Sequence, residues 1–283
     1  MRIRVTSDST CDLNQDYLTA HQVELLPLYT IKDGVTFRDG VDITPADIFA
    51  HVAAGGALCS TAANNVEDYH ALFTRVLREC DAIIHVDISA DFSSCYQNAC
   101  VAAEDFPGQV FVVDSRNLST GHGHVVCEAV KMAEAGEMTP AEIADSLREL
   151  TGRVEASFLL DQLEYMRKGG RCSAVVALGA NLLKLKPCIE VVDGKMRVGK
   201  KYRGSFDKCI LEYVRDRLQG RGDLVPERIF ITHTPVNDGL VEQVRATILR
   251  YAPFTEMIET EAGCTVSCHC GPGTLGILFI RSK

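Results

Sequence analysis

The stretch AIIHVDISADFSSCYQNACVAAEDFPGQVFVVDS, residues 82–115, contains the pattern that decides the fold. It begins with an apolar run of strand length at 82–88, continues with helical spacing at 93–106 and ends with a second apolar run at 109–115. A strand, a helix and a second strand in this order typically form a unit whose two strands run parallel in one sheet. The stretch therefore predicts an α/β fold with a mostly parallel sheet.

The same alternation continues on both sides of this stretch. Residues 3–7 form a short apolar strand, and the Asp33-Gly34 pair marks a hairpin at about 23–40. Thr44-Pro45 caps a helix, and Thr139 with Glu142 forms a capping box that opens another helix. We therefore assign residues 1–152 to an N-terminal α/β domain, in which helices flank the sheet and the hairpin is an insertion.

The pattern changes after about residue 152. A strand is followed by the basic, glycine-containing segment 167–173 and by an apolar helix at 174–185. A second hairpin surrounds Asp193-Gly194, and the chain ends with a helix, a strand, a helix and two final strands. These features predict a C-terminal α+β domain at 153–283.

Composition places the chain among ordinary globular proteins. Of its 283 residues, 46% are hydrophobic and 24% are charged, and the net charge of −9 argues against a general nucleic-acid binder. No apolar run has the length of a membrane span, and the N-terminus lacks the apolar core of a signal peptide. The twelve cysteines are scattered through predicted helices and strands rather than concentrated as in a small secreted protein, so we expect a reducing cytoplasm.

The charge is unevenly distributed. Residues 161–210 contain eleven basic and five acidic residues, a net charge of +6, so the remainder of the chain carries −15. Such a segment is either a solvated face or a docking surface for an anionic group or an acidic partner.

Hydroxyl and carboxyl side chains follow three of the predicted strands, at 7–10, 89–94 and 114–115. Ligands of open α/β sheets bind beyond the carboxyl ends of the strands, so these clusters indicate a binding crevice. Ser93 and Ser94 also stand where a helix begins, and free backbone N–H groups there can help to hold an anion. The alternative is that these residues only cap helices.

The segment CTVSCHCGPG, residues 264–273, places His269 before a Gly-Pro-Gly turn. The turn could be purely structural, it could hold His269 at a strand edge, or Cys264, Cys268 and Cys270 could bind a metal. We expect no metal site, because no second separated pair of ligands accompanies these thiols. Nucleotide-binding loops and the G-x-S-x-G elbow are also absent, so we expect no cofactor.

Seven motifs in order resemble those of the DegV family, over essentially the whole chain. They are DSTCDL (8–13), the hydroxyl pair Ser60-Thr61, DISADFSSCYQNA (87–99), VVDS (112–115), RKGGR (167–171), YRG (202–204) and HCGPGTLG (269–276). The resemblance implies a bacterial fatty-acid-binding protein that carries lipid for a separate ATP-dependent fatty acid kinase subunit and is not itself an enzyme. It also implies an acyl chain buried between the two domains.

The resemblance further implies roles for particular residues. The fatty-acid carboxylate would be held by hydroxyls at the positions of Ser60, Thr61, Ser93 and Ser94, while His269 and Arg171 would support acyl phosphate formation. Exposed cations of the basic segment would dock the kinase: Arg167, Lys168, Lys201 and Arg203. Two alternatives remain open, namely a stand-alone hydrolase or transferase that uses Ser93 with His269 on a small carboxylic ligand, and a lipid storage or chaperone protein.

Overall fold

A four-stranded parallel sheet forms the N-terminal half of the molecule, in the order β2-β1-β6-β7. The computed structural model describes residues 1–173, 175 and 185–282; most of the apolar helix expected at 174–185 lies outside them. The strands are β1 (Ile3–Asp8), β2 (Glu24–Leu26), β6 (Ala82–Asp87) and β7 (Val110–Asp114). All six residues of β6 are buried, as expected for a central parallel strand covered on both faces. The predicted parallel sheet is confirmed.

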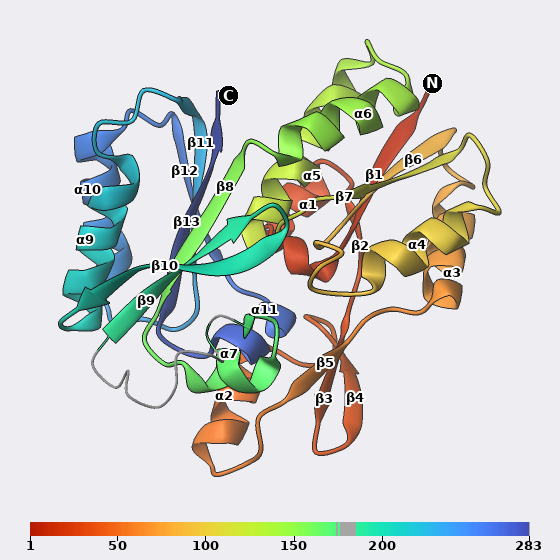
Figure 1. Cartoon of the computed structure of the whole chain (residues 1–283). Helices are drawn as coiled ribbons and strands as arrows, with labels where there is room; N and C mark the ends of the chain where they lie inside the picture. The colour runs from red at the N-terminus through yellow and green to blue at the C-terminus, as the bar shows by residue number, and fades with distance from the viewer. Residues whose placement is uncertain (174, 176–184, 283) are drawn as a thin grey trace.

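Helices cover both faces of this sheet (Figure 1). One layer contains α3 (Val66–Val76) and α4 (Cys95–Ala103), and the other contains α5 (Ser119–Ala135) and α6 (Pro140–Thr151). Thr139 and Glu142 form the predicted capping box of α6. The short η1 (Ser9–Cys11) and α1 (Gln15–Ala20) connect β1 to β2.

The C-terminal half is built on a six-stranded, mostly antiparallel sheet in the order β10-β9-β8-β13-β11-β12. Its strands are β8 (Val154–Leu160), β9 (Leu185–Val192), β10 (Lys195–Arg203), β11 (Leu224–His233), β12 (Glu256–Glu261) and β13 (Thr274–Arg281). Helices α9 (Phe206–Leu218) and α10 (Leu240–Tyr251) cover its outer face (Figure 1). The α+β expectation is thereby confirmed.

Helix α5 lies between the two sheets, in contact with β1 and β6 on one side and with β8 and β13 on the other. Its N-terminal half is buried without interruption, and even His124 is fully enclosed. The chain passes from one sheet to the other between Thr151 and Val154. The division of the chain at 152/153 stays a prediction.

A small third sheet extends below the two main sheets (Figure 1), in the order β4-β3-β5. It consists of β3 (Tyr29–Lys32), β4 (Val35–Arg38) and β5 (Ser60–Ala62). Asp33 and Gly34 take φ angles of 51° and 78° at the predicted hairpin turn, where glycine avoids steric strain. The insertion is shorter than the expected 23–40, because β2 pairs with β1 in the parallel sheet.

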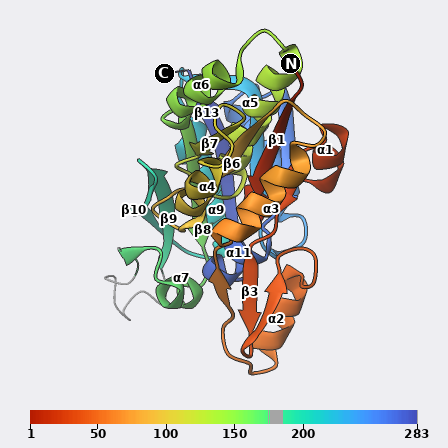
Figure 2. The ribbon, with the colours of Figure 1, turned by 90° about the vertical axis from the view of Figure 1, so that its right-hand side faces the viewer.

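Helix α11 (Cys264–Cys270) packs against β3 and β5 of this third sheet and lies at its upper end in Figure 2. Helices α2 (Pro45–Ala53) and α7 (Glu164–Gly169) pack against α11. Thr44 caps α2 as expected, and the structure adds a capping box with Asp47. The sequence pattern near residues 264–276 predicted only a turn and a strand, so α11 is a correction. Two carboxylates far away in the sequence accept hydrogen bonds from the backbone at the start of α11. Asp39 accepts from the N–H groups of Cys264 (2.9 Å) and Thr265 (3.0 Å), and Asp12 accepts from the N–H group of Gly263 (2.9 Å).

Among the described helices, none combines the length and the apolar character that crossing a membrane requires.

Acidification should weaken the junction between the two halves at His124. Its Nε2 bonds to the carbonyl of Leu278 on β13 at 3.0 Å, and burial lowers the pKa of the ring to about 4. Because the unfolded chain takes up a proton near pH 6.5 and the folded one does not, the free energy of unfolding falls between pH 6.5 and 4, by about 3 kcal/mol for this group. Denaturant titrations of lipid-free protein should show a smaller loss over this pH range for His124→Gln; an equal loss would contradict the assignment.

Candidate functional site

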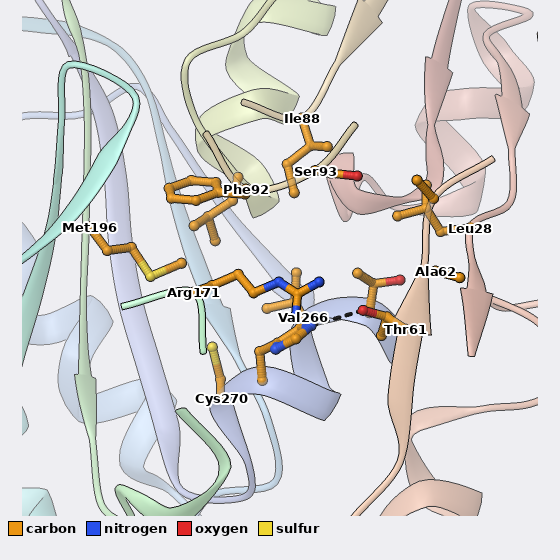
Figure 3. A pocket seen from close by; sticks show the side chains of 14 residues that line it. Leu28, Thr61, Ala62, Ile88, Phe92, Ser93, Arg171, Met196, Val266 and Cys270 are labelled. Carbon is orange, nitrogen blue, oxygen red and sulfur yellow. Dashed lines mark hydrogen bonds between the residues drawn. The ribbon is translucent and has the colours of Figure 1, made fainter. Parts of the chain in front are cut away.

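An apolar cavity lies between the ends of the parallel strands and α11. Its walls are mostly hydrocarbon and include Leu28, Ile88, Phe92, Leu118, Met196 and Val266. Figure 3 labels five of these side chains, which come from both halves of the molecule and point toward a common space: Leu28, Ile88, Phe92, Met196 and Val266.

A second cavity adjoins the first on the side of the C-terminal sheet. Leu118, Val266 and Cys270 line both cavities and form the wall between them. Phe158 of β8 and Leu278 of β13 also line the second cavity. The two apolar cavities thus lie on either side of these three side chains, between the two sheets.

Polar groups gather in the first cavity. Thr61 Oγ1 and His269 Nε2 share a hydrogen bond of 2.9 Å, and the side chain of Arg171 reaches toward this pair (Figure 3). Ser93 joins the lining from the loop between β6 and α4. Four segments far apart in the sequence thus bring two hydroxyls, an imidazole and a guanidinium into one apolar cavity.

His269 is neutral at physiological pH. Burial and the neighbouring positive charge of Arg171 lower the pKa of its imidazole to about 4. Its Nδ1 is buried and has no hydrogen-bond partner among the described residues. The family resemblance gives His269 and Arg171 the same role in acyl phosphate formation, but only Arg171 brings a full positive charge to the cavity.

Close backbone packing fixes the position of His269. A Cβ atom added to Gly169 at the end of α7 would lie 2.3 Å from His269 Nδ1, so only glycine permits this approach. After the helix, Gly271 has a φ of 73°, and a Cβ there would lie 2.5 Å from the ring of Tyr165. The Gly-Pro-Gly turn therefore ends α11 and lets it pack tightly against α7.

The structure separates the predicted hydroxyl residues. Thr61 and Ser93 line the cavity, whereas Ser60 and Ser94 are exposed and are not part of its lining. Ser93 Oγ donates to Cys95 Sγ at 3.1 Å and accepts from the Cys95 N–H at 3.3 Å. Ser93 thus lies two residues before the first residue of α4, beside the cavity.

The four predicted docking residues are all exposed cations. Arg167 and Lys168 lie on α7, and Lys168 pairs with Glu164 at 3.0 Å, while Lys201 and Arg203 lie on β10. The structure shows their exposure and leaves their role a prediction.

Two of the three strand-end clusters brace the fold instead of lining the cavity. Asp8 is fully buried; it accepts hydrogen bonds from the Ile88 N–H at 2.6 Å and the Thr10 N–H at 2.8 Å. Asp114 similarly accepts from the N–H groups of Arg116 and Ala90. Of the three clusters, only the segment 89–94 contributes lining residues, through Phe92 and Ser93.

The apolar lining was missed by sequence reasoning. Leu28, Leu118, Met196 and Val266 lie in four separate segments, each within an ordinary apolar pattern. No spacing rule distinguishes a residue that lines a cavity from one that fills a core.

Within the described residues, no group of three or more His, Cys, Asp and Glu side chains could hold a metal ion.

The family model for uncharacterised proteins of the DegV family matches residues 2–282. The chain belongs to the DegV family. A DegV domain-containing protein of Deinococcus radiodurans is 30% identical over 98% of both chains.

Solved structures of the family share the fold. A DegV-family protein of Thermus thermophilus, described for its fatty-acid binding, superposes with a TM-score of 0.89 at 31% identity, covering 99% of this chain and all of that one. DegV of Bacillus subtilis, described as a fatty-acid-binding protein, has a TM-score of 0.85 at 24% identity and 99% coverage of both chains. The likeness to the Bacillus subtilis protein, at 24% identity, supports the fold alone.

Proposed function

We propose that this chain binds a long-chain fatty acid in the two adjoining cavities and presents the carboxylate to a separate ATP-dependent kinase subunit for acyl phosphate formation. The observation that carries the proposal is the polar cluster of Thr61, Ser93, Arg171 and His269 in the first of two adjoining, otherwise apolar cavities. The Thermus relative, described as binding fatty acids, supports the choice of ligand class.

The tail supplies most of the affinity in this proposal. Each buried methylene contributes about 0.8 kcal/mol, so about fourteen methylenes give roughly 11 kcal/mol before the cost of ordering the chain. The carboxylate contacts then fix the register and orientation of the ligand. A tail of about 14–18 carbons follows, because a shorter one buries too few methylenes to survive purification.

The head-group cluster suits a carboxylate that must remain reactive. Two hydroxyls can hold the oxygens without neutralising them, and Arg171 supplies the positive charge that the cavity otherwise lacks. The arriving negative charge also raises the pKa of His269 from its low value and favours a protonated ring. Both groups would then stabilise the negative charge of the phosphoryl group during transfer.

Phosphoryl transfer needs a partner, because the sequence contains no phosphate-cradling loop of its own. The exposed cations Arg167, Lys168, Lys201 and Arg203 are the docking residues that we assign to this partner. Location in a reducing cytoplasm remains part of the proposal and rests on the distribution of the cysteines.

A hydrolase or transferase built on Ser93 and His269 is less well supported. The hydrogen bonds of the structure join His269 to Thr61 and Ser93 to Cys95, so no Ser93–His269 pair is formed. A lipid storage or chaperone protein would need the same cavity but no partner kinase, and acyl phosphate formation distinguishes it from the carrier.

Ser93→Ala should weaken fatty-acid binding by about 1–3 kcal/mol, the usual cost of losing a hydrogen bond to a charged group. The tail contacts remain, so binding persists at reduced affinity. Titration with a fluorescent fatty acid measures the change, and Ser94→Ala serves as the matched control because Ser94 is exposed beside the cavity. Equal affinities for Ser93→Ala, Thr61→Ala and the control would show that the carboxylate binds elsewhere.

A further inference from the structure

Two cysteines flank the Thr61–His269 hydrogen bond. Cys59 lies two residues before Thr61, and Cys268 directly precedes His269. The two cysteines therefore lie on the same two chain segments that the Thr61–His269 hydrogen bond joins. Helix α11 packs against β5 and β3 of the small sheet. Cys59 packs against the small apolar cluster that contains Cys268, and both are free cysteines.

The surroundings of this thiol pair are apolar. Cys268 is buried in a small cluster with Ile43, Ile48 and Cys264, against which Cys59 packs from the edge. Burial raises the pKa of both thiols, and the positive charge of Lys32 partly opposes this rise in the pKa of Cys59. Cys59 is also the more exposed of the two, so a soluble oxidant reaches it first.

We propose that Cys59 and Cys268 are an oxidation site that forms a disulfide with peroxide as the oxidant. The Cys59 thiolate attacks one peroxide oxygen, the O–O bond breaks, and hydroxide leaves and takes up a proton to give water and a sulfenic acid. The sulfur of Cys268 then attacks the sulfur of Cys59 and loses its proton, while the S–O bond breaks and a second water leaves. Two thiols are oxidised as one peroxide is reduced to two waters.

The disulfide would tie the start of β5 to α11 beside the carboxylate cluster. Thr61 and His269 would then be held together covalently through their neighbours, and the segments could no longer separate at this point. The expected consequence, which rests on the proposed function, is that the fatty acid enters and leaves more slowly. The low thiolate fraction of both cysteines makes the reaction slow, so the site responds to sustained rather than brief oxidant exposure.

Peptide mapping tests the chemistry without reference to any ligand. Full-length protein is treated with hydrogen peroxide, the remaining thiols are alkylated, and the digest is analysed by mass spectrometry without reduction. We expect a linked peptide that joins Cys59 to Cys268, absent from Cys59→Ser and Cys268→Ser and retained in Cys264→Ser, the control from the same cluster. Over-oxidation of Cys59 without the linked peptide, or linkage of Cys59 to another cysteine, would overturn the proposal.

Ligand exchange tests the consequence. Fully cross-linked protein should exchange a fluorescent fatty acid at about one tenth of the rate of the reduced protein or at a lower rate, because exchange then depends on another local opening. Dithiothreitol should restore the rate, and Cys268→Ser should exchange at the same rate before and after peroxide. Unchanged exchange in cross-linked protein would overturn the role of the disulfide. Failure of the reduced protein to bind any fatty acid would instead refute the proposed function, while peptide mapping still decides the oxidation site.

Discussion

Arg171→Ala and His269→Ala should each reduce acyl phosphate formation by about three orders of magnitude while the fatty acid stays bound. The tail provides most of the binding energy and neither substitution touches its path through the second cavity. The transferring phosphoryl group, in contrast, loses the positive charge of Arg171 or the imidazole of His269 beside it. The measurement combines labelled ATP, the partner kinase subunit and each variant loaded with fatty acid.

Arg78→Ala is the matched control for this experiment, since Arg78 is an exposed cation of the N-terminal half. It should retain full activity. If Arg171→Ala and His269→Ala lose the bound fatty acid to the same extent as they lose acyl phosphate formation, the two residues act in binding rather than in transfer.

Val266→Phe should abolish tight binding of long chains, because Val266 belongs to the wall that the proposed tail crosses from the first cavity to the second. Val266 is buried and lines both of them, so a phenyl ring at this position occupies the space that a tail must cross. Exclusion of about six methylenes would cost about 5 kcal/mol, a loss of more than a thousandfold in affinity. Chains of about eight to ten carbons, which need only the first cavity, should be affected far less.

Affinity measured against chain length tests this prediction. Val101→Phe provides the control, because it makes the same valine-to-phenylalanine change at a position on α4 that is 51% exposed. Thermal unfolding of the lipid-free variants establishes that both are folded. An unaltered preference for long chains in a folded Val266→Phe protein would place the tail outside the adjoining cavities.

The sequence predicted those parts of the fold that local patterns encode. Continuous apolar runs indicate buried parallel strands, and β6 with its six buried residues is the clearest case. The capping boxes at Thr44 and Thr139 fix the starts of α2 and α6 through contacts within four residues. Such elements need no information from elsewhere in the chain.

Helix α11 could not be predicted in the same way. Its sequence CTVSCHC contains cysteines and β-branched residues, which are weak helix formers, and it spans only seven residues. The helix is stabilised by Asp39, which lies 225 positions before Cys264. A helix that depends on a distant carboxylate carries no local signal.

The site was predicted only in part for the same reason. Resemblance to the family indicated Thr61, Ser93, Arg171 and His269, which the structure brings into one cavity, but it also indicated the exposed Ser60 and Ser94. The neutral state of His269 depends on burial beneath α7 and on the position of Arg171, neither of which a sequence contains. The pair of apolar cavities is a property of packing between two sheets and has no sequence motif.

Mass spectrometry of the lipid released from denatured protein tests the central claim most directly. Protein expressed in bacteria and purified without added lipid should release a fatty acid of about 14–18 carbons. Its amount should approach one molecule per chain and should fall in Val266→Phe. An organic extract free of fatty acid, from folded and freshly purified protein, would contradict the account.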